Sequence, residues 1–362
     1  MSDLCREYGI SRKTGHKLKA RFERSGAVGL LDASRAPKHI PHKTPPEIVA
    51  LLVSERLEHP TWGAKKLKAS LEARLGHSLP AASTLGDILK RRGLVEPSKR
   101  RRKYKPSPTR LRIAHAPNDI WCVDYKGQFR LGDRSYCYPL TASDLATRFL
   151  LTCEGMPAIS EEAAIEEFQE TFRTHGLPAV IRSDNGVPFA TAGLAGLSRL
   201  SVFWIRLGIA LERIRPGHPE ENGAHERMHR TLKRDTARPA QSNLLRQQER
   251  FDAFRHEFNH DRPHEALGMR PPAALYAPSA RRYPDRLPEL DYPTHDDVVI
   301  ANSNGAIRLG RKNVYLSMAL VGQPIGLRED DDGRWLVSFA NLDLGFVGID
   351  RRLTPLPPPA TG

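Results

Sequence analysis

Residues 216–234 read PGHPEENGAHERMHRTLKR and are the most informative stretch of this chain. Pro, Gly and an Asn-Gly pair open it, and the helical pattern that follows contains no Gly or Pro until Pro239. Side chains spaced three, four, seven or eight residues apart share one face of a helix. At these spacings we expect one face to carry Asn222, Glu226, His229, Arg230 and Lys233. A single carboxylate among polar and cationic groups suits a metal ion and a polyanion, and the alternative is a solvated face with ion pairs.

Two aspartates upstream favour the metal-ion interpretation. Asp124 lies inside the apolar strand pattern IWCVDY (120–125), where a charge is costly unless it is paired or bound to a metal. Asp184 follows a second apolar strand pattern, although Asp-Asn-Gly is also ordinary turn chemistry. The order along the chain is therefore strand Asp, strand-end Asp and helix Glu.

This order resembles the DDE family of retroviral integrases and transposases, which has an RNase H-like core. The segments that carry the resemblance are IWCVDY (120–125), IRSDNGVPF (181–189), residues 216–233 and FNHDRPHEALG (258–268). They are most similar to insertion-sequence transposases with an integrase-type core. The resemblance implies that Asp124, Asp184 and Glu226 are catalytic and hold two ions of Mg²⁺ or Mn²⁺. Glu220 and Glu221 are alternatives to Glu226, which we favour because it follows Asn-Gly by the spacing of the family.

The reaction of this family explains why three carboxylates are needed. Two divalent ions about 3.5–4 Å apart can activate the attacking oxygen and stabilise the leaving oxygen at a phosphodiester. Mg²⁺ prefers carboxylate oxygens and keeps several waters, so three side chains suffice. The implied function is a DNA transposase that binds insertion-sequence ends, cleaves a strand and joins the freed 3′-OH to target DNA. The alternative is a catalytically idle DNA-binding protein derived from a transposase.

The overall charge agrees with DNA as the partner. The 362 residues include 56 Lys+Arg and 42 Asp+Glu, a net charge of +14. Such an excess indicates a polyanion, nucleic acid before an anionic membrane surface. No apolar run is long enough to span a bilayer, and the four cysteines show no CxxC spacing. We expect a cytoplasmic protein that binds terminal inverted repeats and target DNA, forms a homo-oligomer on DNA and does not bind membranes.

Two helical units are expected in front of the core. Residues 1–33 combine a helix, a turn at Gly9 and a basic helix, which is typical of a helix-turn-helix that contacts DNA through Arg12, Lys13 and Lys17. The third helix that such folds place in front is missing, so we expect a truncated unit or a plain helical hairpin. Residues 45–96 predict three short helices, either a second helix-turn-helix-like unit or a helical spacer.

The rest of the chain completes an α/β multidomain fold class. Residues 97–116 are expected to be a basic linker whose cations lie along DNA phosphates, namely Arg100, Arg101, Arg102 and Lys103. Residues 117–277 are assigned to the RNase H-like mixed-sheet integrase core, whose first three strands we expect to form an antiparallel meander. Residues 294–354 contain short strands between turns and predict a small SH3-like β-barrel, followed by a Pro-rich tail.

Overall fold

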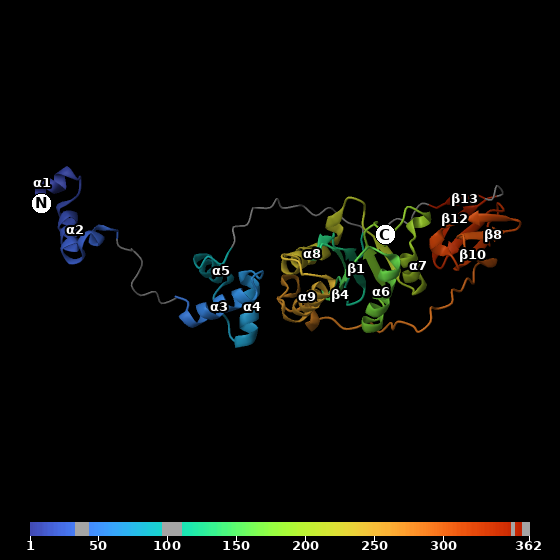
Figure 1. Cartoon of the computed structure of the whole chain (residues 1–362), viewed down its shortest axis with the longest axis horizontal. Coiled ribbons are helices and arrows are strands. Elements are labelled where there is room, and N and C mark those ends of the chain that lie inside the picture. Colours follow the sequence, from blue (N-terminus) through green and yellow to red (C-terminus); the bar gives the residue numbers. More distant parts are fainter. Residues whose placement is uncertain (33–42, 96–110, 349–351, 357–362) are drawn as a thin grey trace. The chain divides into compact units, whose positions relative to one another are not determined.

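The computed structural model describes residues 1–32, 43–95, 111–348 and 352–356, which fall into two compact units, Met1–Val49 and Ala50–Gly362 (Figure 1). In the first unit, α1 (Ser2–Glu7) and α2 (Arg12–Ser25) pack where Cys5 meets Gly15, and a 3-10 turn follows at Gly26–Leu30. The Ser11 hydroxyl caps α2 by accepting a hydrogen bond from the Thr14 N–H at 3.1 Å. The expected helix, Gly turn and basic helix are therefore present, and Arg12, Lys13 and Lys17 are exposed.

Three helices occupy the region for which we predicted them. They are α3 (Pro46–Glu58), α4 (Ala64–Leu75) and α5 (Ala82–Arg91). Leu52, Leu67 and Leu71 are fully buried among them because the apolar residues recur at helical spacing. Two glycines end helices in this region: Gly76 closes α4 in the left-handed conformation, and Gly93 follows α5 with a positive φ.

A six-stranded mixed sheet forms the centre of the second unit. Its strands are β1 (Ile120–Tyr125), β2 (Phe129–Arg130), β3 (Tyr136–Asp144), β4 (Leu150–Met156), β5 (Val180–Ser183) and β6 (Ala210–Arg213). Five of them follow the order β2-β3-β1-β5-β6, and β4 pairs with β3. β3 is antiparallel to β1 and β4, which confirms the expected meander, and β5 runs parallel to β1 and β6.

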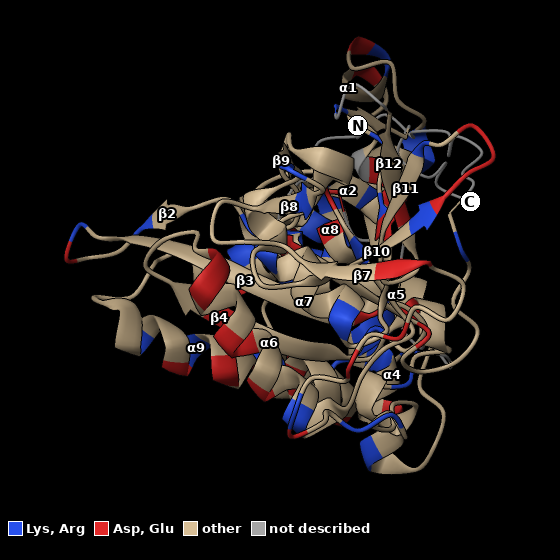
Figure 2. Cartoon of the chain, turned by 90° about the vertical axis from the view of Figure 1, so that its right-hand side faces the viewer, with Lys and Arg blue, Asp and Glu red and all other residues tan. Residues whose placement is uncertain are grey.

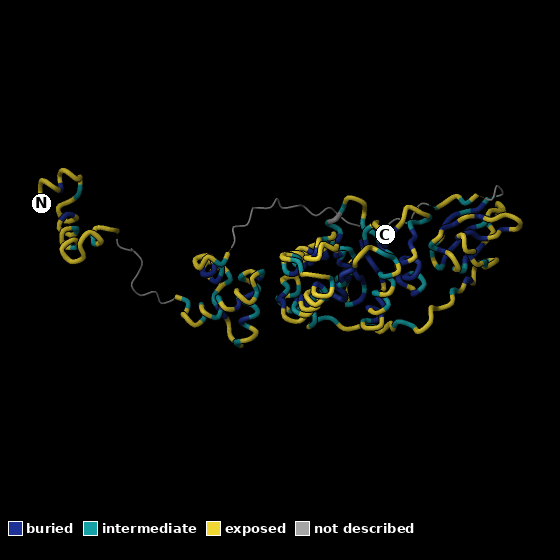
Figure 3. Tube along the Cα trace, in the orientation of Figure 1, coloured by how far each residue is buried: buried dark blue, intermediate teal, exposed yellow. Residues whose placement is uncertain are grey.

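Helices cover both faces of this sheet, whose strands are mostly buried (Figure 3). On one face, α6 (Glu161–His175) and α7 (Arg199–Arg206) pack against Trp121 and Val123. On the other, α8 (Gly223–Thr236) and α9 (Leu244–His256) pack against Leu150 and Cys153. Because side chains alternate along a strand, Asp124 points to the face that α8 covers.

The C-terminal strands form two antiparallel sheets. Strands β7 (Asp297–Ile300), β10 (Pro324–Glu329), β11 (Trp335–Phe339), β12 (Leu342–Val347) and β13 (Leu353–Pro355) make one sheet, and β8 (Ala306–Leu309) and β9 (Lys312–Tyr315) the other. Strand pairing among the described residues does not show the closed SH3-like barrel that we expected. β13 pairs with β12 and extends one residue beyond the range 294–354 that we expected for the barrel. Leu197 and Val202 from the core contribute to the apolar interior of these sheets.

The last residues of the predicted linker, 97–116, include contacts with the core. Leu111 is buried, and the Arg112 N–H donates a hydrogen bond to Glu212 Oε1 at 2.8 Å, so the chain contacts the core at these two residues. The basic residues Arg100, Arg101, Arg102 and Lys103 lie outside the described residues, and their role stays a prediction. In the described ranges, no helix has the length and apolar character that crossing a membrane requires.

Candidate active site

Two aspartates lie at the carboxyl ends of neighbouring strands in the central sheet. Asp124 is the fifth residue of β1, and Asp184 directly follows β5. These strands are parallel neighbours in which Cys122 lies opposite Arg182, and each of these residues is two positions before the acid. The carboxyl ends of parallel strands share one edge, which is where open α/β sheets form their crevices.

Glu226 approaches this edge from the first turn of α8. Burial raises the pKa of Asp124 to about 7, with a further contribution from Asp184 and a smaller one from Glu226, while Lys126 acts in the opposite direction. A carboxyl group responds in this way only to charges that lie near it. The three predicted acids are therefore brought close enough to interact electrostatically.

The two alternative glutamates have other roles in the structure. Glu221 accepts hydrogen bonds from the Arg215 N–H at 2.8 Å and from the Arg215 guanidinium at 2.6 Å. Glu220 lies 2.9 Å from His218 Nδ1. Glu226 is exposed and forms no hydrogen bond or ion pair within the described part of the chain. This supports the choice of Glu226, which remains a prediction.

The five residues that we expected on one face of α8 differ in burial. Asn222 and His229 are buried, and only Glu226, Arg230 and Lys233 of the five are exposed. His229 Nδ1 lies 3.5 Å from Asp124 Oδ2, and burial holds the pKa of His229 well below its usual value. Side chains buried in this way do not contact DNA in this conformation. The sheet causes the difference, because α8 lays this part of its surface on β1 and β3.

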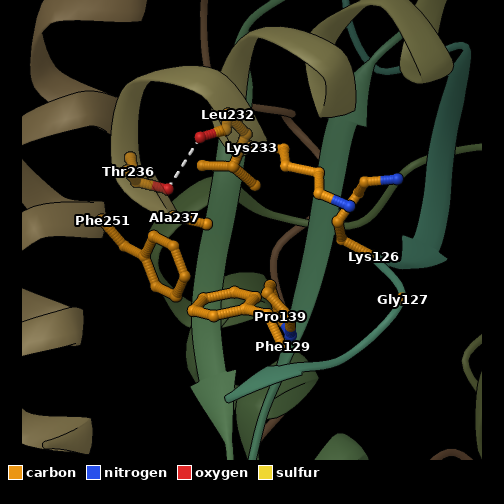
Figure 4. Close-up of a pocket in the computed structure, with 9 residues that line it drawn as sticks. All are labelled: Lys126, Gly127, Phe129, Pro139, Leu232, Lys233, Thr236, Ala237 and Phe251. Carbon is orange, nitrogen blue, oxygen red and sulfur yellow. Dashed lines mark hydrogen bonds between the residues drawn. The ribbon is translucent and has the colours of Figure 1, made fainter. Parts of the chain in front are cut away.

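Lys126 is a candidate that the sequence analysis missed. It follows β1 directly, lies two residues from Asp124 and lines a small hollow with Phe129, Leu232 and Lys233 (Figure 4). In this view, the side chains of Lys126 and Lys233 lie on the same side of the hollow. Only the fold shows that these two lysines are neighbours, because they come from distant segments of the sequence. The alternation of polar and apolar residues around Asp124 could have flagged Lys126 as a neighbour on the same face.

Charge is distributed unevenly over the elements of the core (Figure 2). Helix α6 has the sequence EEAAIEEFQETFRTH, and its glutamates lie on the opposite face of the sheet from α8. Helix α8 ends in Lys233 and Arg234. A polyanion is repelled by the first helix and attracted by the second, so the α8 side is the electrostatically favourable approach for DNA.

The three acids have the ligand chemistry that a divalent metal ion prefers. Asp124, Asp184 and Glu226 offer only carboxylate oxygens, which Mg²⁺ prefers. Burial, and after it the charge of Asp184, raise the pKa of Asp124, and a bound cation would act in the opposite direction. As the side chains stand, no cluster of three or more His, Cys, Asp and Glu residues in the described ranges is arranged to hold an ion.

The sequence of the chain matches models of two kinds of domain. Integrase core domain models match residues 114–219 and 207–272, which together cover the central sheet, α8 and α9. A model described as a homeodomain-like domain matches residues 14–89. These matches agree with the predicted core and with the helix-turn-helix-like character of the N-terminal helices.

Proteins from insertion elements are similar to this chain. The insertion element IS407 uncharacterized 31.7 kDa protein of Burkholderia multivorans is 23% identical over 265 residues, which are 72% of this chain and 92% of that protein. The insertion element IS476 uncharacterized 39.2 kDa protein of Xanthomonas euvesicatoria is 27% identical over 49% of this chain and 51% of that protein. Among solved structures, the HTLV-2 integrase catalytic core domain in complex with magnesium is 14% identical, with a TM-score of 0.36, over 45% of this chain and 98% of that chain. The chain therefore contains a region that matches integrase core domain models, and it is similar to proteins encoded by insertion elements.

Proposed function

We propose that this protein is a DDE transposase that cleaves and joins DNA strands by phosphodiester transfer at Asp124, Asp184 and Glu226. The observation that carries the proposal is the parallel β1–β5 register, which puts two carboxylates at one sheet edge with a third on the covering helix. A purely DNA-binding protein has no need to bring three acids together, because their mutual repulsion only destabilises it.

The acids would act by holding two divalent ions, Mg²⁺ or Mn²⁺. Such ions, when bound, supply Lewis-acid activation of the attacking oxygen and stabilisation of the leaving one. Asp124 is partly buried in the sheet and would be the most rigidly held ligand, whereas Glu226 is exposed and can adjust to the bound substrate. Lys126, Arg230 and Lys233 would bind phosphates next to the scissile one and so orient the strand.

The N-terminal helices would provide recognition of the insertion-sequence ends. Arg12, Lys13 and Lys17 are exposed along the first part of α2, which is where a recognition helix contacts base edges. We further propose that the protein acts as a homo-oligomer on DNA, because joining two transposon ends to one target requires two active sites. The alternative, an idle DNA-binding derivative, shares every one of these binding features and differs only in catalysis.

Cleavage of a labelled transposon end in Mg²⁺ tests the proposal. We expect Asp124→Ala, Asp184→Ala and Glu226→Ala each to abolish cleavage while a gel-shift assay shows that the end is still bound. Glu220→Ala, whose side chain lies 2.9 Å from His218 Nδ1, is the matched control and should remain active. Full cleavage by Glu226→Ala, or no cleavage by the unaltered protein on its own flanking repeats, would refute the assignment.

A further inference from the structure

A chain of buried polar side chains leads to Asp124 on the face of the sheet that α8 covers. Thr141 lies opposite Asp124 in the β1–β3 ladder, and Ser143 lies two residues further along the same face. His225 and His229, one helical turn apart on α8, lie against these two hydroxyls. The exposed fraction is 8% for Ser143 and 3% or less for the other three, so no bulk water satisfies these groups.

The distances connect these groups into one continuous path. Ser143 Oγ lies 2.7 Å from His225 Nδ1, and His225 Nε2 lies 2.8 Å from Thr141 Oγ1. Thr141 Oγ1 lies 2.6 Å from His229 Nε2. His229 Nδ1 then lies 3.5 Å from Asp124 Oδ2, a longer polar contact.

The protons of the path can be assigned from its chemistry. A neutral imidazole has one nitrogen that donates and one that accepts. His229 Nδ1 faces a carboxylate, so the proton belongs on Nδ1, and Nε2 accepts the hydrogen of the Thr141 hydroxyl. Thr141 then accepts from His225 Nε2–H, and His225 Nδ1 accepts from Ser143. In this arrangement every donor points toward Asp124.

A second arrangement is available to the same groups. The Thr141 hydroxyl also lies 3.0 Å from the Asp124 carbonyl oxygen and could donate there instead. Both histidines would then donate from Nε2, which leaves the lone pair of His229 Nδ1 facing a carboxylate oxygen. That contact is repulsive when Asp124 is ionised, so the first arrangement is favoured.

We propose that the path Ser143–His225–Thr141–His229 positions the acids of the active site. It would hold the first turns of α8, and with them Glu226, in register with β1, and give Asp124 a fixed hydrogen-bond donor. The inference rests on the proposed function, since it assigns these four as positioning residues for the three acids. None of the four is expected to contact DNA or a metal.

The packing of α8 explains why its first turn needs these hydrogen bonds to stay on the sheet. The buried apolar side chains of this helix, Met228 and Leu232, follow Glu226 by two and six residues. In the turn that carries Glu226, the buried side chain is His225. Without its hydrogen bonds, that turn would have little to hold it on the sheet, and helix ends with few buried contacts open most easily.

Mn²⁺ binding to the full chain without DNA tests the inference independently of catalysis. The free ion can be followed by its electron paramagnetic resonance signal. We expect Thr141→Val, which removes only the hydroxyl, to raise the Mn²⁺ concentration for half-saturation tenfold or more, the loss typical of residues that orient metal ligands. Thr141→Ser keeps the hydroxyl and should bind like the unaltered protein. A hydroxyl with a merely structural role would lower the unfolding temperature and leave the Mn²⁺ titration unchanged.

Two outcomes would overturn the inference while leaving the proposed function intact. One is an unchanged Mn²⁺ midpoint in folded Thr141→Val when Asp124→Ala has lost the site. The other is a His229 tautomer that carries its proton on Nε2. The ¹⁵N chemical shifts of the unaltered, histidine-labelled protein report this tautomer, even if the variants fail to fold. We expect the proton on Nδ1, and a proton on Nε2 would contradict the path. If Asp124→Ala binds Mn²⁺ and cleaves normally, the proposed function itself is refuted.

Discussion

The buried ion pair behind Asp184 offers a quantitative test of how the site is held. Arg182 on β5 and Glu212 on β6 lie opposite each other in the parallel ladder, with Arg182 Nε 2.6 Å from Glu212 Oε2. Their side chains are 5% and 4% exposed. We choose Glu212→Gln as the perturbation, because glutamine keeps the shape and one acceptor while removing the negative charge.

The expected loss in the free energy of unfolding follows from the Arg182 charge that this substitution leaves without its partner. Removing one partner of a buried ion pair typically costs about 3–5 kcal/mol, since the remaining charge is uncompensated. Glutamine can still accept one hydrogen bond, and the Arg112 carbonyl still accepts from Arg182 at 2.7 Å. We therefore expect the lower end, a loss of about 3 kcal/mol in the free energy of unfolding.

Urea unfolding of the full chain at pH 7 measures this loss. The matched control is Glu170→Gln, which breaks the pair with Arg173 on the surface of α6, where the side chains are 69% and 56% exposed. Exposed pairs contribute less than about 1 kcal/mol. The double variant Arg182→Met with Glu212→Leu leaves no unpaired charge and should recover most of the loss. Equal effects of Glu212→Gln and Glu170→Gln would refute the argument, as would a double variant that loses the sum of its single changes.

Two further predictions concern DNA contact and pH. Lys126→Ala and Lys233→Ala should each weaken binding of a transposon end and flatten the slope of log affinity against log salt concentration by about one unit. Cleavage at saturating DNA should change little. Unchanged slopes in both variants would exclude the α8 side of the core as the path of the DNA. Burial lowers the pKa of His264 to about 3 from an ordinary 6.5, so between these values the unfolded chain binds a proton that the folded chain does not. Acidification from pH 6.5 therefore destabilises the protein, and the stability advantage of the unaltered chain over His264→Phe should shrink between pH 7.5 and pH 5 in urea titrations. A constant difference would contradict the shift.

Local signals in the sequence predicted the helices well. Helix α6 is an example, since Ser160 caps it by accepting from the Ala163 N–H at 3.3 Å and Gly176 closes it. Its apolar stripe, including Phe168 and Phe172, is buried against the sheet. These signals lie within one segment of about 15 residues and need no knowledge of the rest of the fold.

Features that depend on distant segments were predicted less well. The spacing of residues 222–233 gave a helix with one polar face, but the orientation of that helix is set by the sheet beneath it. His225 and His229 are polar residues with buried partners, so no hydrophobic period marks them as interior. Strand β3 did carry a usable signal, because Leu140 and Ala142 alternate with Thr141 and so separate an apolar face from a polar one.

A histidine beside Asp124 suits the metal site that we propose. A lysine in place of His229 would be charged and would compete with a divalent ion for the carboxylate. A neutral imidazole can donate a hydrogen bond and orient Asp124 without cancelling its charge. The charge of Lys126 lowers the pKa of Asp124 less than either burial or Asp184 raises it. The three acids thus keep the mutual repulsion that a bound cation would relieve. The lysines that we propose to bind phosphate do not cancel this repulsion.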